Sequence, residues 1–450
     1  MYFGVTCVAL AVGAVVGCSG SSGGRPAPRS PSGSGAAGGS VGEVGTGGGG
    51  GGAGGGGAGG VAGAGGVTSA GGTAGADAAS PVTVDGGGDA GAPPRTGEVG
   101  PPGFPGWKYT RTIKMNTTAA GAAVMTDVSD FPVPVSLGAG FDFTQAAAHG
   151  EDVRFARADG TPIPYAIESW DRAAQAALVW VKIDKVLGND DTQSFAMYWG
   201  KPDAGDASDS KAVFTTAAGF RGVWHLDEEG STTAGGYHDA SSTGAHATGM
   251  NLAAGSRVDG RVGKGTRVAN AKEQWVSVDG MPAQSFNPGA RMTVSIWGKA
   301  DGFPARSGPG GYDTIFSKGE AWTVQRFNNT RTFETCFDRG NAGCAVGKTA
   351  VTVGQWYHFV MVADGGAQRF YINGVQDAAS SSSTKGNDKP LGIGNQTQYL
   401  GNANEKRSWD GILDEARFYD TAKDAAWIKL DFESQKDGSK LLILGPPTVR

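Results

Sequence analysis

A glycine-rich tract near the beginning of the chain limits what its first hundred residues can fold into. Residues 19–102 consist mainly of glycine, alanine, serine and proline, with unbroken glycine runs at residues 47–52 and 54–57. Because glycine loses more backbone entropy on ordering than any other residue, and no apolar periodicity offsets that loss, the tract cannot support a packed core. We therefore expect residues 19–103 to be a flexible linker that spans on the order of 50 Å. Collagen is excluded because glycine does not recur at every third position. A phosphate-binding loop is excluded because no strand, helix start and lysine accompany the glycines.

The residues before this tract have the pattern of an export signal. The apolar run at residues 8–16 is too short to span a bilayer but has the length of the hydrophobic part of a signal peptide. It ends in the sequence VVGC at residues 15–18, which resembles a bacterial lipobox. That resemblance implies cleavage before Cys18 and lipidation of its thiol. We expect residues 1–18 to be a lipoprotein signal peptide; an ordinary signal peptide in which Cys18 is incidental is the alternative.

The expected location and partners follow from the same region and from the charge of the chain. Ser19, not aspartate, follows Cys18, and the sorting rule of the lipoproteins that the chain resembles then implies the outer membrane or cell surface. A secreted protein is the alternative, and the lipid is the expected link to the membrane. The net charge of -5 and the lack of a basic patch with interleaved aromatic residues argue against a nucleic-acid partner.

The remaining part of the chain, about 345 residues, is long enough for two domains. It contains two cysteines, Cys336 and Cys344, on either side of a turn-rich loop at residues 337–343. Strands flanking this loop would bring the two sulfurs within disulfide range, and an oxidising compartment would keep them bonded. A structural zinc site needs more ligands than this pair supplies, so a disulfide is the better prediction.

Residues 104–210 have the pattern of an all-β sandwich, with short strands at close spacing and a hairpin-like Asp-Gly pair at residues 159–160. The sequences ADGTPIPYAIESW at residues 158–170, VWVK at 179–182 and MYWG at 197–200 resemble the bacterial domain of unknown function 2341. The resemblance implies a fold and a habit of preceding a laminin-G-like domain, but no chemistry.

Three residues of this first domain, Glu168, Trp170 and Asp171, suggest catalysis or sugar stacking. We interpret Trp170 as a packing residue and the two carboxylates as groups at a strand end. The sequence shows no partner acid or base for them at a useful spacing.

Residues 211–450 have a longer all-β pattern, followed by a short helix that we expect Thr421 to cap. Several segments resemble the laminin-G-like, concanavalin A-type jelly roll: VWHLDE at residues 223–228, MTVSIWGK at 292–299, WYH at 356–358, YING at 371–374 and DGILDEARFY at 410–419. The expected fold class is therefore all-β, with two sandwiches behind the linker.

Jelly rolls of this kind include both binding modules and glycosidases. Retaining glycosidases on this fold place alternate carboxylates on one face of a strand in a Glu-x-Asp-x-x-Glu motif, which this chain lacks. Asp414 and Glu415 are adjacent, so we expect them on opposite faces of their strand. No catalytic residue is expected, and non-catalytic recognition of a glycan or extracellular protein is the favoured function. The alternatives are a glycan hydrolase or lyase that uses Glu415 or Glu168, and a structural component of a surface assembly.

The resemblance also implies one structural Ca²⁺ in the second domain. Asp239 and Asp414 match the positions of its acidic ligands, and Asp410 is a weaker candidate, since Ca²⁺ takes six to eight oxygen ligands. The alternative is that Asp239 caps a turn and Asp414 pairs with an arginine such as Arg417.

Exposed aromatic rings on a concave sheet would stack on sugars. The candidates for this role are Trp275, Trp322, Tyr399 and Trp409, whereas we expect Trp297 and Trp356 in the core. The three histidines His225, His238 and His246 match no zinc-ligand spacing, and no zinc site is predicted from them.

Overall fold

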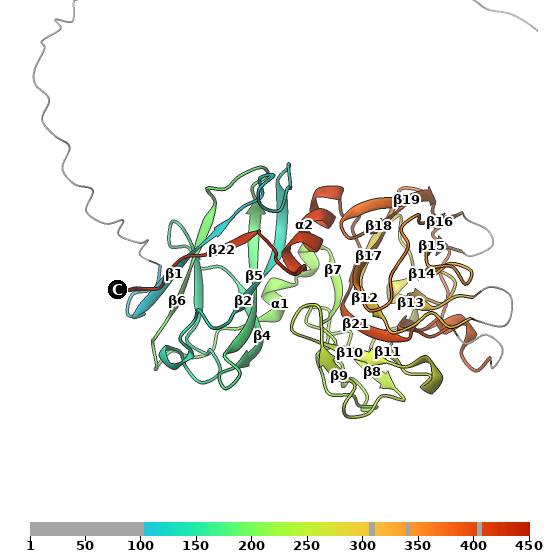
Figure 1. The fold of residues 1–450 in the computed structure, drawn as a ribbon, viewed down its shortest axis with the longest axis horizontal. Coiled ribbons are helices and arrows are strands. Elements are labelled where there is room, and N and C mark those ends of the chain that lie inside the picture. Colours follow the sequence, from blue (N-terminus) through green and yellow to red (C-terminus); the bar gives the residue numbers. More distant parts are fainter. Residues whose placement is uncertain (1–102, 306–310, 339–342, 403–406) are drawn as a thin grey trace, which may run out of the picture. The chain divides into compact units, whose positions relative to one another are not determined.

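The computed structural model describes residues 103–305, 311–338, 343–402 and 407–450, all of them within one unit of the chain, Ala92–Arg450. The signal peptide, Cys18 and nearly all of the predicted linker lie outside these described residues, so their predictions are not examined by the structure. Within the described residues, no helix has both the length and the apolar character needed to cross a membrane. The fold is all-β, as predicted, and contains two sandwiches (Figure 1).

The first sandwich consists of two antiparallel sheets. One sheet has the order β22-β1-β6-β3, in which β22 is Leu442–Leu444, and the other has the order β2-β5-β4. Their bounds are β1 Tyr109–Met115, β2 Val128–Leu137, β3 Arg154–Arg157, β4 Tyr165–Asp171, β5 Ala176–Val186 and β6 Ser194–Trp199. Alternate side chains of β1 are buried, which is the pattern expected of a strand with one face on a core.

The C-terminal tail belongs to this first sandwich. The strands β22, Leu442–Leu444, and β23, Thr448–Val449, both pair with β1, where Ile113 lies opposite Leu444. Figure 1 shows the C-terminus beside β1. The resemblance predicts that this tail belongs to the second domain, within residues 211–450. The second sandwich is instead inserted between two strands of the first.

The second sandwich is larger, and its two sheets contain eight and seven strands. The eight-stranded sheet contains β19 (Val375–Ser381), β18 (Ala367–Ile372), β17 (Trp356–Asp364), β12 (Arg291–Ala300), β21 (Gly411–Tyr419), β10 (Lys264–Val268), β9 (Arg257–Asp259) and β7 (Phe220–Trp224), which pairs with β21. The seven-stranded sheet contains β16 (Cys344–Val346), β15 (Phe333–Phe337), β14 (Trp322–Arg326), β13 (Thr314–Lys318), β20 (Leu391–Ile393), β11 (Trp275–Val278) and β8 (Ala247–Met250). The inner faces of the two sheets form one hydrophobic core.

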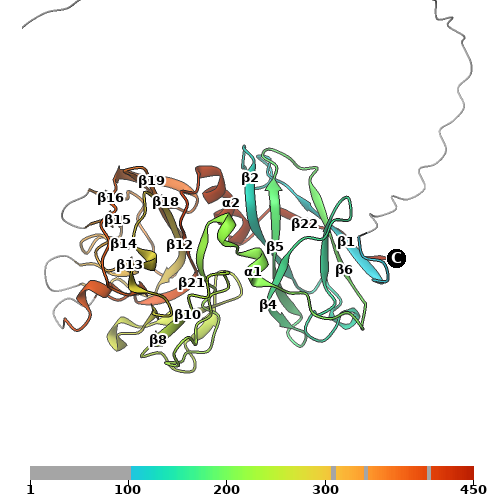
Figure 2. The same cartoon turned by 180° about the vertical axis from the view of Figure 1, so that it is seen from behind.

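Two helices lie between the sandwiches, α1 (Ser210–Val213) and α2 (Ala425–Gln435), and α2 contacts both β2 and β19 (Figures 1 and 2). Asp424, and not Thr421 as predicted, caps α2, because its carboxylate accepts a hydrogen bond of 2.8 Å from the backbone N–H of Trp427. The carbonyl of Thr421 instead accepts a hydrogen bond from the hydroxyl of Thr293. The chain therefore enters the helix three residues later than the sequence pattern indicated.

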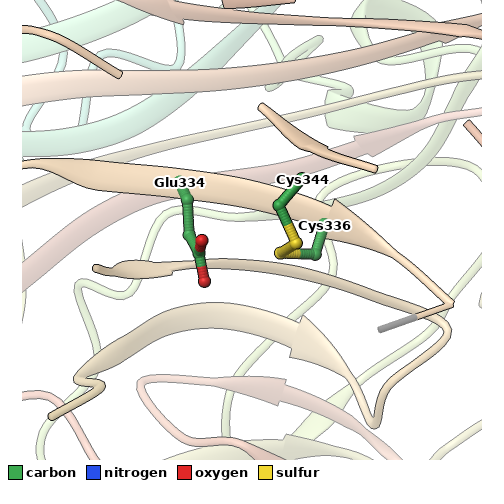
Figure 3. Close-up of side chains that lie close together, drawn as sticks. All are labelled: Glu334, Cys336 and Cys344. Carbon is green, nitrogen blue, oxygen red and sulfur yellow. A yellow bond between two sulfur atoms is a disulfide. The ribbon is translucent and has the colours of Figure 1, made fainter. Parts of the chain in front are cut away.

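The predicted disulfide is confirmed. Cys336 on β15 lies directly opposite Cys344 on β16, with their Cα atoms 4.3 Å apart and the two sulfurs bonded (Figure 3). Glu334 lies nearby on β15, where its carboxylate accepts a hydrogen bond of 2.7 Å from the side chain of Gln325. The disulfide joins β15 and β16, two strands at the edge of the seven-stranded sheet.

Candidate functional site

The four aromatic residues predicted to stack on sugars divide into two pairs. Trp322 and Trp409 are buried in the core of the second sandwich, with at most 1% of either side chain exposed. The indole N–H of Trp322 donates a hydrogen bond of 2.9 Å to the carbonyl of Phe286 inside that core. Neither ring can reach a ligand, so the prediction is wrong for these two residues.

Trp275 and Tyr399, the other pair, line one pocket of 240 Å³ in the second sandwich. Trp275 is the first residue of β11, and Tyr399 ends a short 3₁₀ turn at Thr397–Tyr399. The other lining residues are Met250, Asn251, Glu273, Asn395, Leu400, Gly401, Asn402, Arg407 and Ser408. The volume lies below the range of roughly 300–1,000 Å³ that is typical for drug-sized ligands, so it suits one small ring or chain end.

The aromatic ring of Tyr399 is held from two directions. The guanidinium of Arg407 lies 3.9 Å from the ring centroid, which is cation–π geometry. The phenol hydroxyl donates a hydrogen bond to the carboxylate of Glu320. Because both contacts restrict the ring, it offers a preorganised apolar surface at the pocket.

Polar groups at the same pocket are positioned by the loops that carry them. Asn251 has a left-handed backbone with φ of 54°, and its side-chain amide donates to the carbonyl of Glu273 at 3.1 Å. Leu400 and Met250 are exposed at the same opening. An aromatic surface, several amides and an exposed apolar rim are the groups that recognise a polar ring with one apolar face.

A second set of polar residues is buried between the sandwiches, and sequence reasoning missed it. The imidazole of His225, which follows β7, lies between Glu168 of β4 and Glu415 of β21. Its Nδ1 atom is 2.6 Å from Glu415 Oε1 and 3.3 Å from Glu168 Oε2. The indole N–H of Trp180 donates to Glu168 Oε2 at 2.6 Å, and Arg417 donates to Glu415 Oε2 at the same distance. We call these five residues the interface network.

The position of Glu415 depends on a β-bulge in β21. We expected Asp414 and Glu415 on opposite faces, but both point away from the inner core, whereas Leu413 and Ala416 belong to it. The pairing register with β12 shifts at this point, and Glu415 has φ of 50°. A bulge inserts one extra residue, so the alternation of side chains is interrupted and two neighbours share a face.

Further polar contacts extend the network to α2. Arg417 Nη1 lies 3.1 Å from Asp431 Oδ1, and His358 Nε2 lies 3.3 Å from Asp431 Oδ2. The amide of Gln435 accepts a hydrogen bond of 2.7 Å from the indole of Trp297, which is buried as predicted. Trp356, also predicted in the core, is only partly buried.

Burial and mutual charge shift the pKa values of these groups. Burial raises the pKa of Glu168 to about 8. Burial acts to lower the pKa of His225, but the carboxylates of Glu415 and Glu168 outweigh it and raise the pKa to about 10. His225 therefore carries a proton at neutral pH, and its Nδ1–H donates to the carboxylate of Glu415.

The predicted calcium ligands are not brought together. The Asp239 carboxylate accepts from the backbone N–H groups of Val223, Ser241 and Ala245 at 2.7–2.8 Å, which is the turn-capping alternative. Asp414 Oδ2 accepts from the backbone N–H groups of Arg261 and Val262. Asp410 accepts from the backbone of Asn270 at 3.2 Å. Among the described residues these three aspartates do not form one of the close groups of three or more potential metal-ligating side chains.

Two other groups of potential metal ligands occur in the described residues, and each has another role. One contains Glu334, Cys336 and Cys344, whose cysteines form the disulfide. The other contains Glu168, His225 and Glu415. In this group, His225 Nδ1 makes a hydrogen bond to Glu415 Oε1, whereas a metal ion would need this nitrogen deprotonated and free to bind it.

The remaining predicted residues have structural contacts. His238 and His246 lie side by side with ring centroids 5.6 Å apart, separate from His225. Trp170 packs against Phe141 and Phe143, in agreement with its interpretation as a packing residue.

Two family models match the chain. Residues 270–429 match the Concanavalin A-like lectin/glucanases superfamily, and residues 149–227 match a domain of unknown function, DUF2341. A search of curated proteins found no match.

Several solved structures are similar in part. A domain of an extracellular arabinanase from Geobacillus stearothermophilus, in complex with arabinotriose, has 17% identity and a TM-score of 0.35, over 48% of this chain and 98% of that one. The binding domain of Paraclostridial Mosquitocidal Protein 1 has 16% identity and a TM-score of 0.35, over 47% of this chain and 52% of that one. A pentraxin from Limulus polyphemus has 16% identity and a TM-score of 0.26, over 36% of this chain and 82% of that one.

The two family matches have the order and approximate position that the sequence motifs predict. The chain thus carries a DUF2341 domain followed by a concanavalin A-like domain of the laminin-G type.

Proposed function

We propose that the second sandwich is a non-catalytic recognition module that binds the end of a glycan at the pocket of Trp275 and Tyr399. The observation that supports this most directly is the pocket itself, in which a fixed aromatic ring, amide side chains and an exposed apolar rim surround 240 Å³. A sugar ring presents hydroxyls at its edge and C–H groups on its face, so these groups complement it.

The same geometry supports a glycan hydrolase less well than a binding module. Glycoside hydrolysis needs two carboxyl groups that flank a bound glycosidic bond. Glu273 is the one acidic residue in the lining of this pocket. The other candidates, Glu168 and Glu415, have side chains at most 2% exposed and are held by His225, so a polysaccharide cannot reach them.

A glycan array tests the proposal with a protein of residues 103–450. We expect defined glycans to bind, and Tyr399→Ala to reduce that binding at least tenfold because the ring surface is lost. Val375→Ala is the control, since Val375 is exposed on β19, outside the pocket. Thermal unfolding of each variant separates loss of binding from loss of folding.

Two results would contradict the proposal. Hydrolysis of an arrayed glycan by the wild-type protein would establish an enzyme. A blank array, together with a protein partner whose binding Tyr399→Ala leaves intact, would establish protein recognition elsewhere on the surface. Each array is run with calcium and with chelator, since the predicted Ca²⁺ remains a proposal of its own.

We also propose that Cys18 carries a lipid that anchors the protein at the outer membrane or cell surface. The glycine-rich linker would then hold the sandwiches near surface ligands and raise their effective concentration. Cys18→Ser should move the protein from the membrane fraction to the soluble fraction. Retention of this variant in the membrane fraction would exclude the anchor.

A further inference from the structure

One face of the first sandwich covers an outer face of the second. The covering face comes from β2, β4 and β5. Phe131 of β2 contacts Trp427 of α2 with ring centroids 5.4 Å apart. Trp180 of β5 contacts two groups of the second sandwich. Its ring is stacked on that of His225, with centroids 5.7 Å apart, and the guanidinium of Arg417 lies 4.7 Å from its ring centroid.

The outer face of the second sandwich carries apolar side chains that would be exposed to water without the first sandwich. The residues on this side of the second sandwich that share one hydrophobic cluster with the first sandwich include Val360, Val362, Tyr371, Tyr419, Trp427, Ile428 and Leu430. All of them are at most 4% exposed in the complete chain. Soluble monomers rarely leave an apolar patch of this kind in contact with water.

The charged groups on the same face are also completed by the first sandwich. Glu415 and Arg417 of β21 pair with each other, but the imidazole of His225 also lies 3.3 Å from Glu168, and only the first sandwich supplies Glu168. Removing one partner from a buried ion network leaves an uncompensated charge, which is strongly destabilising. The motifs that carry the two family resemblances contribute these residues, Glu168 and Trp180 from one and Glu415 and Arg417 from the other.

We infer that the first sandwich serves as a dedicated intramolecular partner of the second, and that the two unfold as one cooperative unit. The surface formed by β2, β4 and β5 is fitted to a laminin-G-like sandwich that carries a buried Glu-x-Arg pair and a histidine on neighbouring strands. The chain crosses the interface twice, once after β6 and again before β22, so the return of β22 to β1 ties the second sandwich back to the first. This role is independent of what the pocket binds.

Hydrogen exchange in the complete chain tests the inference. Glu168→Gln changes the first sandwich only, where it replaces the carboxyl group beside His225 with an amide. We expect it to accelerate amide exchange in peptides from β5 and in peptides from β12 and β17 of the second sandwich by a similar factor. The control is Asp259→Asn, which removes an exposed ion pair with Lys264 and should change neither set. Acceleration confined to β5 would overturn the inference.

A cut chain provides a second measurement that does not depend on any variant folding poorly. The connection at residues 201–209 is largely exposed, so a protease recognition sequence can replace residues 203–205. After cleavage we expect the two fragments, held by the interface and by the pairing of β22 and β23 with β1, to elute as one particle in size-exclusion chromatography at neutral pH. Separation of the fragments in that experiment would show that the sandwiches are independent domains.

Discussion

At the scale of single residues, the proton on His225 links the stability of the protein to pH. The pKa of Glu168 is raised from 4.5 to about 8, and that of His225 from 6.5 to about 10. Both groups bind a proton more tightly in the folded chain than in the unfolded chain. Their contribution to the free energy of unfolding is therefore full below the unfolded pKa values and is lost as pH rises through the folded values.

We expect the free energy of unfolding of residues 103–450 to fall as the pH rises from about 6.5 to 8, because above pH 8 the lowered pKa values of Lys318 and Lys423, both about 8, act in the opposite direction. Urea unfolding at several pH values measures it. His225→Gln should reduce this dependence, because the imidazole proton is absent and only Glu168 of the pair still titrates there. On the acid side the pKa of Glu415 is lowered despite burial, because His225 and Arg417 favour its charged form, so its contribution is lost as pH falls. An alkaline slope that is equally steep in the His225→Gln variant would assign the titration to another group.

Substitution of Asp239 distinguishes a turn-capping role of this residue from calcium binding. Its carboxylate oxygens accept from three backbone N–H groups and the hydroxyl of Ser241. Each buried hydrogen bond contributes about 1 kcal/mol, so Asp239→Ala should destabilise the protein by roughly 2–4 kcal/mol. If the role is capping alone, thermal unfolding of the wild-type protein gives the same midpoint in calcium and in chelator. A bound ion would be indicated if chelation lowers the unfolding midpoint of the wild-type protein but leaves the midpoint of Asp239→Ala unchanged.

At the scale of secondary-structure elements, α2 provides a test of where a helix begins. Asp424→Ala should cost about 1 kcal/mol, because the N–H of Trp427 loses its acceptor. Thr421→Ala is the matched control, since only the backbone carbonyl of Thr421 makes the observed hydrogen bond to Thr293. Urea unfolding compares the two, and an equal loss in both variants would argue against Asp424 as the cap.

The elements themselves were predictable to different degrees. Strands such as β12 alternate clearly, and the loop between Cys336 and Cys344 is short, so local pattern was sufficient for both. The partners of Glu168 were not predictable, because His225 and Glu415 are 190 residues apart in sequence and meet only in the folded chain. The bulge at Glu415 reversed the expected direction of one side chain, since strand alternation carries no signal for an inserted residue.

Burial of aromatic residues was the other limit of the sequence analysis. Trp275 and Trp322 both begin strands of the same sheet and both are buried, at 5% and 0% exposed, yet only Trp275 lies at the pocket. The sequence alone does not show which buried tryptophan lies beside a pocket.

At the scale of the whole molecule, the C-terminal tail turns a linear order of domains into an insertion. Leu441 lies just before β22, is fully buried, and belongs to the hydrophobic cluster shared by the two sandwiches. Its backbone carbonyl accepts a hydrogen bond of 2.7 Å from the N–H of Asn116, directly after β1. The last ten residues therefore contribute to the stability of a sandwich whose other strands were completed more than two hundred residues earlier.

Leu441→Ala measures how far that contribution extends. Removing a fully buried leucine should cost about 2–5 kcal/mol, and because the two sandwiches share one cluster, the loss should appear in both. Val449→Ala is the control: Val449 is 71% exposed on β23, and its truncation should change stability by less than about 0.5 kcal/mol. Exchange of amide hydrogens in peptides from β1 and from β17 reports on the two sandwiches separately. If Leu441→Ala accelerates exchange in β1 while β17 remains as protected as in the control, the tail stabilises the first sandwich alone and the shared cluster does not couple the two.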